Sequence, residues 1–248
     1  MIAFPENIGI EAYNAGFRRA RGTYILILDD DSFPAAKAIE RMVGRFQEDA
    51  QLGIVALDVH GYDCMEQDQK KKAEGQHPST AADLSKTTTY SPPKYLMSFN
   101  GAGAGIRRSV MEKVGYYPEE FFLYGNEIDL ALRVWDAGYT VRMFPDIIAY
   151  HKASLTNRLS WRAPFYYTRN SYWLLWKHYP FLPALMRTFQ LMYYSVYFSM
   201  EQATWIYLKA LFSAWRGLPD ALRRRRCVAW RVAAGLRIPW RNHFTFYR

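Results

Sequence analysis

The chain has 248 residues, half of them apolar, which is enough for one large domain or a domain with an appendage. This composition excludes a protein that is disordered over most of its length. The two cysteines, Cys64 and Cys227, lie far apart and show no metal-ligand spacing, so neither a disulfide framework nor a zinc site is indicated.

The formal charge of +9 is concentrated near the C-terminal end. Residues 216–248 contain nine arginines and a single acidic residue, Asp220, whereas the remainder of the chain is nearly neutral. The charge of the body therefore gives no indication of its substrate, and the basic segment needs a separate explanation.

Helical and strand-like patterns alternate in the first part of the chain. Apolar residues recur at helical spacing over 10–21, and a short apolar run follows over 24–28. A second amphipathic helix, with Pro34 in its first turn, extends to about residue 49, and another apolar run covers 53–59. The apolar face of this second helix consists of Ile39, Met42, Val43 and Phe46. The alternation predicts an α/β domain with a mostly parallel sheet, which binds ligands beyond the carboxyl ends of its strands.

A polar segment over 60–94 is too long for an ordinary connection, so we expect a mobile flap there. After it, Ser109 and Glu112 have the spacing of a capping box and predict the start of a short helix. A further helix is predicted over 126–138, with two short strands within 139–151.

Long aromatic helical segments follow residue 161 and lead into the basic segment. Their longest uncharged run, 188–200, has 13 residues, whereas a membrane-spanning helix needs about 20. We therefore expect helices that lie in an anionic membrane surface, with the arginine cluster on the lipid headgroups. This cluster consists of Arg223, Arg224, Arg225 and Arg226. Nucleic acid would attract the same charge, but no helix-turn-helix, RNP or zinc-finger pattern supports a nucleic-acid partner.

Three consecutive carboxylates, Asp29, Asp30 and Asp31, follow the first apolar strand. Like charges repel and Asp is a poor strand former, so neither packing nor propensity favours them. On a tight turn, Asp29 and Asp31 can hold one Mg²⁺ or Mn²⁺ ion, which binds few protein oxygens together with substrate phosphates. The alternative is an acidic helix N-terminus before Pro34. Because a cap needs one carboxylate and not three, we prefer the metal site.

Two acidic residues open the predicted helix 126–138. Glu127 and Asp129 are two positions apart and project to nearly opposite sides of a helix, so only one can serve a reacting atom. Asp129 has Arg133 four positions on, which predicts a structural ion pair. Glu127 has no basic residue at that spacing, and both catalysis and dipole compensation stay open for it. His151 ends a strand-like run, where a structural histidine and a ligand are both plausible.

Four segments, taken together and in order, resemble the inverting family 2 glycosyltransferases of GT-A fold, especially the bacterial rhamnosyltransferase and galactofuranosyltransferase-like branch. The segments are NIGIEAYNAG (7–16), YILILDDDSFP (24–34), GAGAGIRRSVMEKVGYYPEEFFLYGNEIDLALRVWDAGY (101–139) and PDIIAYHKAS (145–154). The resemblance covers about residues 6–154, and it is specific as a set although no single segment is.

The resemblance implies roles for residues that match the family motifs. Asp29 and Asp31 would hold Mg²⁺ or Mn²⁺ against the diphosphate of a nucleotide-sugar donor, and His151 would complete that site. Glu127 falls where the family has its general base for the acceptor hydroxyl, while Asn126 replaces the acidic residue that usually precedes it. The residues that would contact the donor are Asn7, Asn14, Asp30 and Gly101.

The resemblance also implies an organisation and a function. A partial GT-A-like catalytic domain would occupy 1–158, and a helical, membrane-associating region would occupy 159–248. The implied reaction is sugar transfer to a glycan or lipid-linked acceptor in cell-envelope polysaccharide synthesis, by a peripheral protein on the cytoplasmic face of the bacterial inner membrane.

Family members normally begin with a strand, a helix and a strand that hold the nucleotide base, and this chain begins after them. We therefore expect an N-terminally truncated sheet in which strand 24–28 lacks a neighbour. Three explanations stay open, namely a misplaced start codon, a truncated gene, or a partner chain that completes the sheet, and a homo-oligomer is a further possible partner. An alternative of another class stays open, namely a non-catalytic remnant or a membrane-bound assembly partner.

Overall fold

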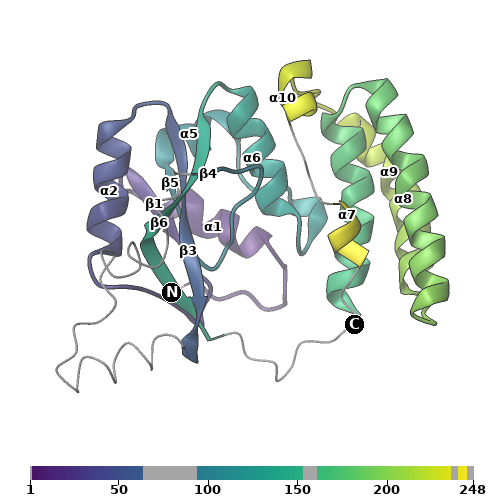
Figure 1. The fold of residues 1–248 in the computed structure, drawn as a ribbon, viewed down its shortest axis with the longest axis horizontal. Helices are drawn as coiled ribbons and strands as arrows, with labels where there is room; N and C mark the ends of the chain where they lie inside the picture. Colours follow the sequence, from purple (N-terminus) through teal and green to yellow (C-terminus); the bar gives the residue numbers. More distant parts are fainter. Residues whose placement is uncertain (1, 64–93, 153–160, 236–239, 245–248) are drawn as a thin grey trace. The chain divides into compact units, whose positions relative to one another are not determined.

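The computed structural model describes residues 2–63, 94–152, 161–235 and 240–244 (Figure 1). The chain forms two compact units: the first comprises 1–19, 116–136 and 157–248, and the second comprises 20–115 and 137–156. The predicted boundary at residue 158 lies outside the described residues, so the division into 1–158 and 159–248 stays a prediction.

A six-stranded mixed sheet forms the centre of the second unit. The strands are β1 (Tyr24–Ile27), β2 (Ser32–Pro34), β3 (Leu52–Gly61), β4 (Lys94–Tyr95), β5 (Ala104–Arg107) and β6 (Thr140–His151). Their order is β1-β5-β3-β6-β2, with β4 beside β6. Among the strand pairs of the described residues, β3 and β6 alone are parallel, and the other pairs are antiparallel. The prediction of a mostly parallel sheet is therefore wrong.

The direction of a strand depends on its partners, which the apolar pattern does not contain. β1, β3 and β6 run in the same direction, but β5 inserts between β1 and β3 in the opposite direction. β1 consequently has a neighbour, contrary to the prediction, although no strand of the described residues pairs with its other edge. The two short strands predicted within 139–151 form one strand, β6.

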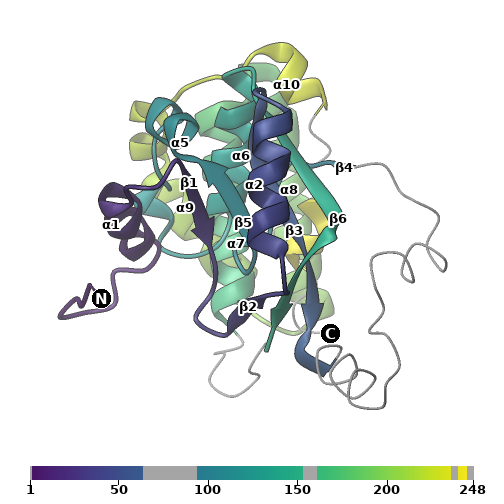
Figure 2. The ribbon, with the colours of Figure 1, turned by 90° about the vertical axis from the view of Figure 1, so that its left-hand side faces the viewer.

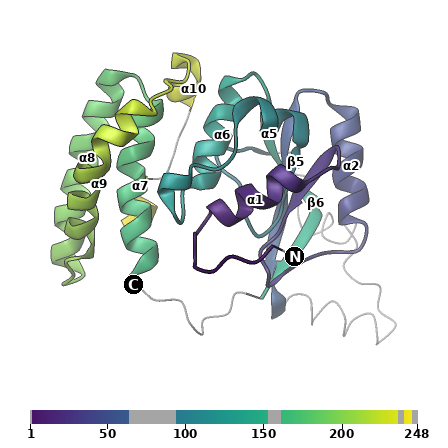
Figure 3. The same ribbon diagram turned by 180° about the vertical axis from the view of Figure 1, so that it is seen from behind.

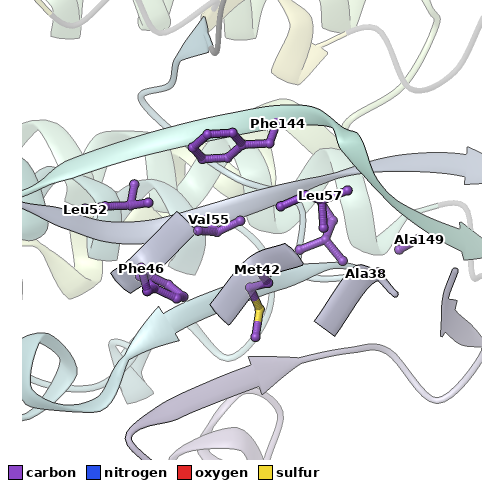
Figure 4. Packing of buried hydrophobic residues seen from close by; sticks show 9 residues of the cluster. Ala38, Met42, Phe46, Leu52, Val55, Leu57, Phe144 and Ala149 are labelled. Atoms are coloured by element: carbon purple, nitrogen blue, oxygen red, sulfur yellow. The ribbon is translucent and has the colours of Figure 1, made fainter. Parts of the chain in front are cut away.

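Helix α2 (Ala38–Glu48) packs on one face of this sheet (Figures 2 and 4). Its Met42 and Phe46 are buried as predicted, but Ile39 is 49% exposed and Ala38 occupies the core instead. A Cβ atom on Gly105 of β5 would overlap the sulfur of Met42, so glycine at this position lets the helix lie directly on the sheet.

Two local predictions around the helices of this unit are wrong. Pro34 lies in strand β2 and not in the first turn of α2. Because β2 is an edge strand, the sheet tolerates the missing N–H of the proline. Helix α5 (Arg108–Val114) starts before Ser109, so Ser109 is not its cap and Glu112 pairs with Arg108 instead (3.2 Å).

Only the ends of the predicted flap over 60–94 are described. His60 and Gly61 belong to β3, and Lys94 opens β4. Residues 64–93 lie outside the described residues.

The first unit is helical in its described residues. It contains α1 (Glu11–Arg19), η1 (Glu119–Phe121), α6 (Asn126–Asp136), α7 (Arg162–His178), α8 (Phe181–Glu201), α9 (Ile206–Arg223), α10 (Trp230–Gly235) and η2 (Trp240–Phe244). Helices α7, α8 and α9 pack against one another (Figure 3). Within the described residues, no helix combines the length and apolar character that crossing a membrane requires.

Candidate metal centre

A tight acidic turn joins β1 to β2. The N–H of Ser32 donates to the carbonyl of Asp29 (3.1 Å) and closes the turn, while the N–H of Lys152 donates to the carbonyl of Asp31 (2.9 Å). The turn is thus fixed to the end of β6. Because α2 begins only at Ala38, the acidic residues do not form a helix N-terminus, and dipole compensation does not explain them.

The pairing of β2 with β6 brings His151 to this turn. Ser32 and His151 lie opposite each other in the register, and Nε2 of His151 is 3.0 Å from Oδ1 of Asp31 and 3.9 Å from Oδ2 of Asp29. One ligand atom from each of the three side chains lies within 4.8 Å of the other two. The three residues that the sequence predicts as metal ligands therefore lie together in the fold.

The donor set fits a hard divalent cation. Two carboxylates suit Mg²⁺ and Mn²⁺, and an imidazole is a common further ligand for a transition metal such as Mn²⁺. Nε2 of His151 and Oγ of Ser32 are buried and form no hydrogen bond with the described residues. Buried polar atoms elsewhere in the described residues share this property, so the donor set itself is what fits a cation.

Two of the predicted donor contacts lie at the same edge of the sheet. Asp30 is exposed at the tip of the acidic turn, and Gly101 lies in the turn that leads into β5. β5 pairs with β1 so that Ala104 lies opposite Ile27, which brings this second turn to the carboxyl end of β1. The donor contacts of Asp30 and Gly101 stay predictions.

The two predicted donor contacts in the first unit have local partners. The buried amide of Asn14 donates to the carbonyl of Tyr117 and accepts from its N–H, both at 2.9 Å, and it also donates to Glu11 (2.6 Å). Asn14 is thus a structural clamp and not the predicted donor ligand, because a distant segment already uses its amide. Oδ1 of Asn7 accepts from the N–H of Gly9 (2.9 Å) just before α1.

Asp129 lies at the centre of a buried ionic network in the first unit. Its carboxylate is 1% exposed and lies 2.6 Å from Nη2 of Arg133, 2.7 Å from Nε2 of His178 and 3.0 Å from Nζ of Lys177. Burial raises the pKa of Asp129, but these three groups outweigh it and hold the pKa well below its usual range. The predicted ion pair with Arg133 is confirmed. The contacts of Asp129 with Lys177 and His178 were not predictable from helical spacing, because these two residues lie on another helix, α7.

Replacing Asp129 by asparagine should lower the free energy of unfolding by about 3–5 kcal/mol, since it leaves buried cations without their counter-charge. Asp220, a partly exposed carboxylate on α9 that pairs with Arg223 and Arg224, provides the control. Asp220→Asn should cost less than about 1 kcal/mol. Urea unfolding of the two variants measures both values, and equal losses would contradict a special role for the buried network.

Glu127 lies at the start of α6 beside an aromatic pair. Tyr124 stacks on Tyr167 with a centroid separation of 4.6 Å. Burial raises the pKa of Tyr167, and the nearby charge of Glu127 raises it further. The preceding loop is fixed by Asn170, whose Nδ2 donates to the carbonyls of Leu123 and Tyr124 (both 2.8 Å). Glu127 is therefore presented on a firmly held helix start, and its role as a base stays a prediction.

The arginine cluster is divided between structural and exposed residues. Arg225 donates to the carbonyls of Trp176 and Tyr179, and it thereby caps the C-terminal end of α7. This contact corrects the prediction that Arg225 binds headgroups. Arg223, Arg224 and Arg226 are exposed, and the first two pair with acidic residues.

Comparison with known proteins finds similarity to glycosyltransferases over part of the chain. Residues 1–115 match the model of Glycosyl transferase family 2. The matched residues include the acidic turn but not His151. A curated relative, "Probable glycosyltransferase YdaM" of Bacillus subtilis (strain 168), is 23% identical over 182 residues, or 71% of this chain. The chain spans 42% of the length of that relative. Both similarities support a transferase.

Two solved structures are also similar to the chain, each with a TM-score of 0.48. GalNAc-T7 with UDP, GalNAc and Mn²⁺ is 14% identical, over 69% of this chain and 38% of that one. The mannosyltransferase PcManGT from Pyrobaculum calidifontis, in complex with GDP-Man and Mn²⁺, is 17% identical, over 96% of this chain and 63% of that one. Likeness at this level assigns no ligand to the present chain.

Proposed function

We propose that the chain is a metal-dependent, inverting glycosyltransferase that moves a sugar from a nucleotide-sugar donor to a glycan or lipid-linked acceptor. The observation that carries this proposal is the cluster of Asp29, Asp31 and His151 at the carboxyl end of β1. Two carboxylates and an imidazole suit a cation that binds a diphosphate.

In this proposal Asp29, Asp31 and His151 hold a Mg²⁺ or Mn²⁺ ion, which supplies Lewis-acid stabilisation of the diphosphate leaving group. The two backbone hydrogen bonds of the acidic turn keep the carboxylates in place before the donor binds. His151 adds a largely buried imidazole, and the pairing of His151 with Ser32 between β6 and β2 holds it at the turn. Asp30, which is exposed in the same turn, is the proposed contact for the ribose.

Glu127 is the proposed general base. Its carboxylate accepts the proton of the acceptor hydroxyl while that oxygen bonds to the anomeric carbon and the sugar–phosphate bond breaks on the opposite face. One base and one in-line displacement give inversion. The firmly held start of α6 supports this role, since a base must be positioned within hydrogen-bond reach of the hydroxyl.

The finer assignment rests on sequence resemblance. We propose a rhamnosyltransferase-like or galactofuranosyltransferase-like enzyme of cell-envelope polysaccharide synthesis, acting at the cytoplasmic face of the bacterial inner membrane. The four ordered segments between residues 7 and 154 support this placement.

Removal of divalent metal tests the proposal. The full chain, stripped with EDTA and dialysed, is incubated with a panel of UDP-, GDP- and dTDP-sugars, and release of nucleoside diphosphate is followed. We expect at least about a hundredfold loss of donor turnover after stripping, and recovery with Mn²⁺ or Mg²⁺, since a Lewis acid contributes several kcal/mol. Donor turnover that the stripped protein retains in full would contradict the proposal, as would a panel in which no donor is consumed.

A further inference from the structure

Helix α8 buries four small or hydroxyl-bearing residues together with two large apolar ones, and it exposes six large apolar residues. Its buried residues are Ala184, Thr188, Leu191, Ser195, Phe198 and Ser199. On the opposite face Leu182, Met186, Phe189, Tyr193, Val196 and Met200 are between 47% and 78% exposed. A surface helix of a water-soluble domain has the reverse arrangement, with its apolar stripe inward and polar residues outward.

The inward face of α8 packs through hydroxyl groups. Thr188 and Ser195 each donate to the carbonyl four residues earlier, at 2.8 and 2.9 Å. Thr188 also accepts from Nε1 of Trp176 in α7 (3.0 Å), and Ser195 shares a hydrogen bond with the hydroxyl of Tyr172 (3.1 Å). Small residues and interhelical hydrogen bonds inside, with bulky apolar residues outside, characterise helices that pack together in contact with lipid.

Helix α9, which packs against α8, carries exposed positive charge. Lys209, Phe212 and Arg216 are exposed at helical spacing, and the guanidinium of Arg216 lies 5.9 Å from the ring centre of Phe212. Figures 1 and 3 show α8 and α9 side by side on the same side of α7, in agreement with their mutual packing. Cations interleaved with aromatic rings complement the headgroup region of an anionic membrane.

We propose that the exposed face of α8, together with the exposed Lys209 and Arg216 of the neighbouring helix α9, is a docking surface for an anionic lipid bilayer. Since no helix of the described residues is long and apolar enough to cross a membrane, α8 lies along the surface with its apolar side chains among the acyl chains. A second copy of the chain would present the same cations again, whereas anionic headgroups neutralise them. This inference rests on the membrane location in the proposed function and names the surface that would provide it, but it does not depend on sugar transfer.

Vesicle flotation of the full chain tests the docking surface. The vesicles consist of phosphatidylcholine, alone or with about one third phosphatidylglycerol. The double variant Phe189→Ser, Tyr193→Ser should lower the partition coefficient by about a hundredfold, at roughly tenfold for each large side chain withdrawn from lipid. Ile39→Ser on α2, at a similarly exposed apolar residue, should bind vesicles like the unchanged protein.

A second variant tests the contribution of charge. Lys209→Gln with Arg216→Gln should lower binding to the anionic vesicles by roughly thirtyfold and leave binding to pure phosphatidylcholine unchanged. Equal flotation of the Phe189, Tyr193 variant and the unchanged protein would overturn the proposal. A second outcome would also overturn it: the unchanged protein does not bind vesicles and sediments as a dimer, and the Phe189, Tyr193 variant sediments as a monomer. The assay contains neither donor nor metal, so its failure is distinct from failure of the proposed sugar transfer.

Discussion

Replacement of Asp31 by asparagine should abolish the metal-dependent donor turnover of the full chain. The amide preserves the size of the side chain but removes one of two carboxylates from the cluster, and it leaves the cation with one anionic ligand, Asp29. Loss of about 3–4 kcal/mol of leaving-group stabilisation corresponds to roughly 10²–10³-fold in rate. Release of nucleoside diphosphate at fixed Mn²⁺ measures the rate, and titration followed by electron paramagnetic resonance of free Mn²⁺ measures affinity.

Asp146 offers a matched control for this variant. It belongs to the same unit, its side chain is 32% exposed against 28% for Asp31, and it pairs with Arg45 away from the cluster. Asp146→Asn should change neither the donor turnover nor the affinity for Mn²⁺. Unchanged turnover and Mn²⁺ affinity in Asp31→Asn would exclude Asp31 as a metal ligand, and the proposed function would lose its principal support.

Replacement of Glu127 by glutamine should lower the turnover of the donor by about 10²–10⁴-fold, which is the usual contribution of a general base. The amide has nearly the same shape but cannot accept the acceptor proton. Because Glu127 is not among the proposed donor ligands, the dissociation constant of the donor should stay the same. Steady-state rates and calorimetric titration of the donor identified in the metal experiment measure the two quantities.

The same variant distinguishes catalysis from compensation of the helix dipole. If Glu127 serves only the dipole of α6, its replacement should cost about 0.3–1 kcal/mol of unfolding free energy and leave turnover unchanged. Glu119→Gln is the control, because Glu119 is an exposed carboxylate of the same unit that pairs with Arg224. We expect this control to keep full turnover, and an equal loss in both variants would remove Glu127 from the base role.

The acidic turn shows which features neighbouring residues in the sequence can predict and which they cannot. The buried run from Tyr24 followed by three carboxylates predicted a turn at the end of a strand, and the structure has that turn. The sequence did not predict that Pro34 continues into a short strand, β2, beside β6. This pairing is what fixes His151 next to Asp31, and it involves segments more than a hundred residues apart.

Contacts of single side chains show the same limit. The pair formed by Asp129 and Arg133 was predictable because both residues lie on one helix, four positions apart. Asn14 and Arg225 were assigned to ligands, yet backbone groups of distant segments already bind them. The type and spacing of residues define what a side chain can bind, but only the packed structure decides which partner lies within hydrogen-bond distance of it.

The sequence by itself determined the alternation of helices and strands, the acidic corner after β1, the ion pair on α6 and the short uncharged run, 188–200, of the aromatic helical segments. These are properties of neighbours in the chain, set by the periods of helix and strand. The tertiary structure decided the direction of β5, the meeting of His151 with the acidic turn and the outward apolar face of α8. Each of these depends on contacts between segments far apart in the chain, and periodicity within one segment carries no information about them.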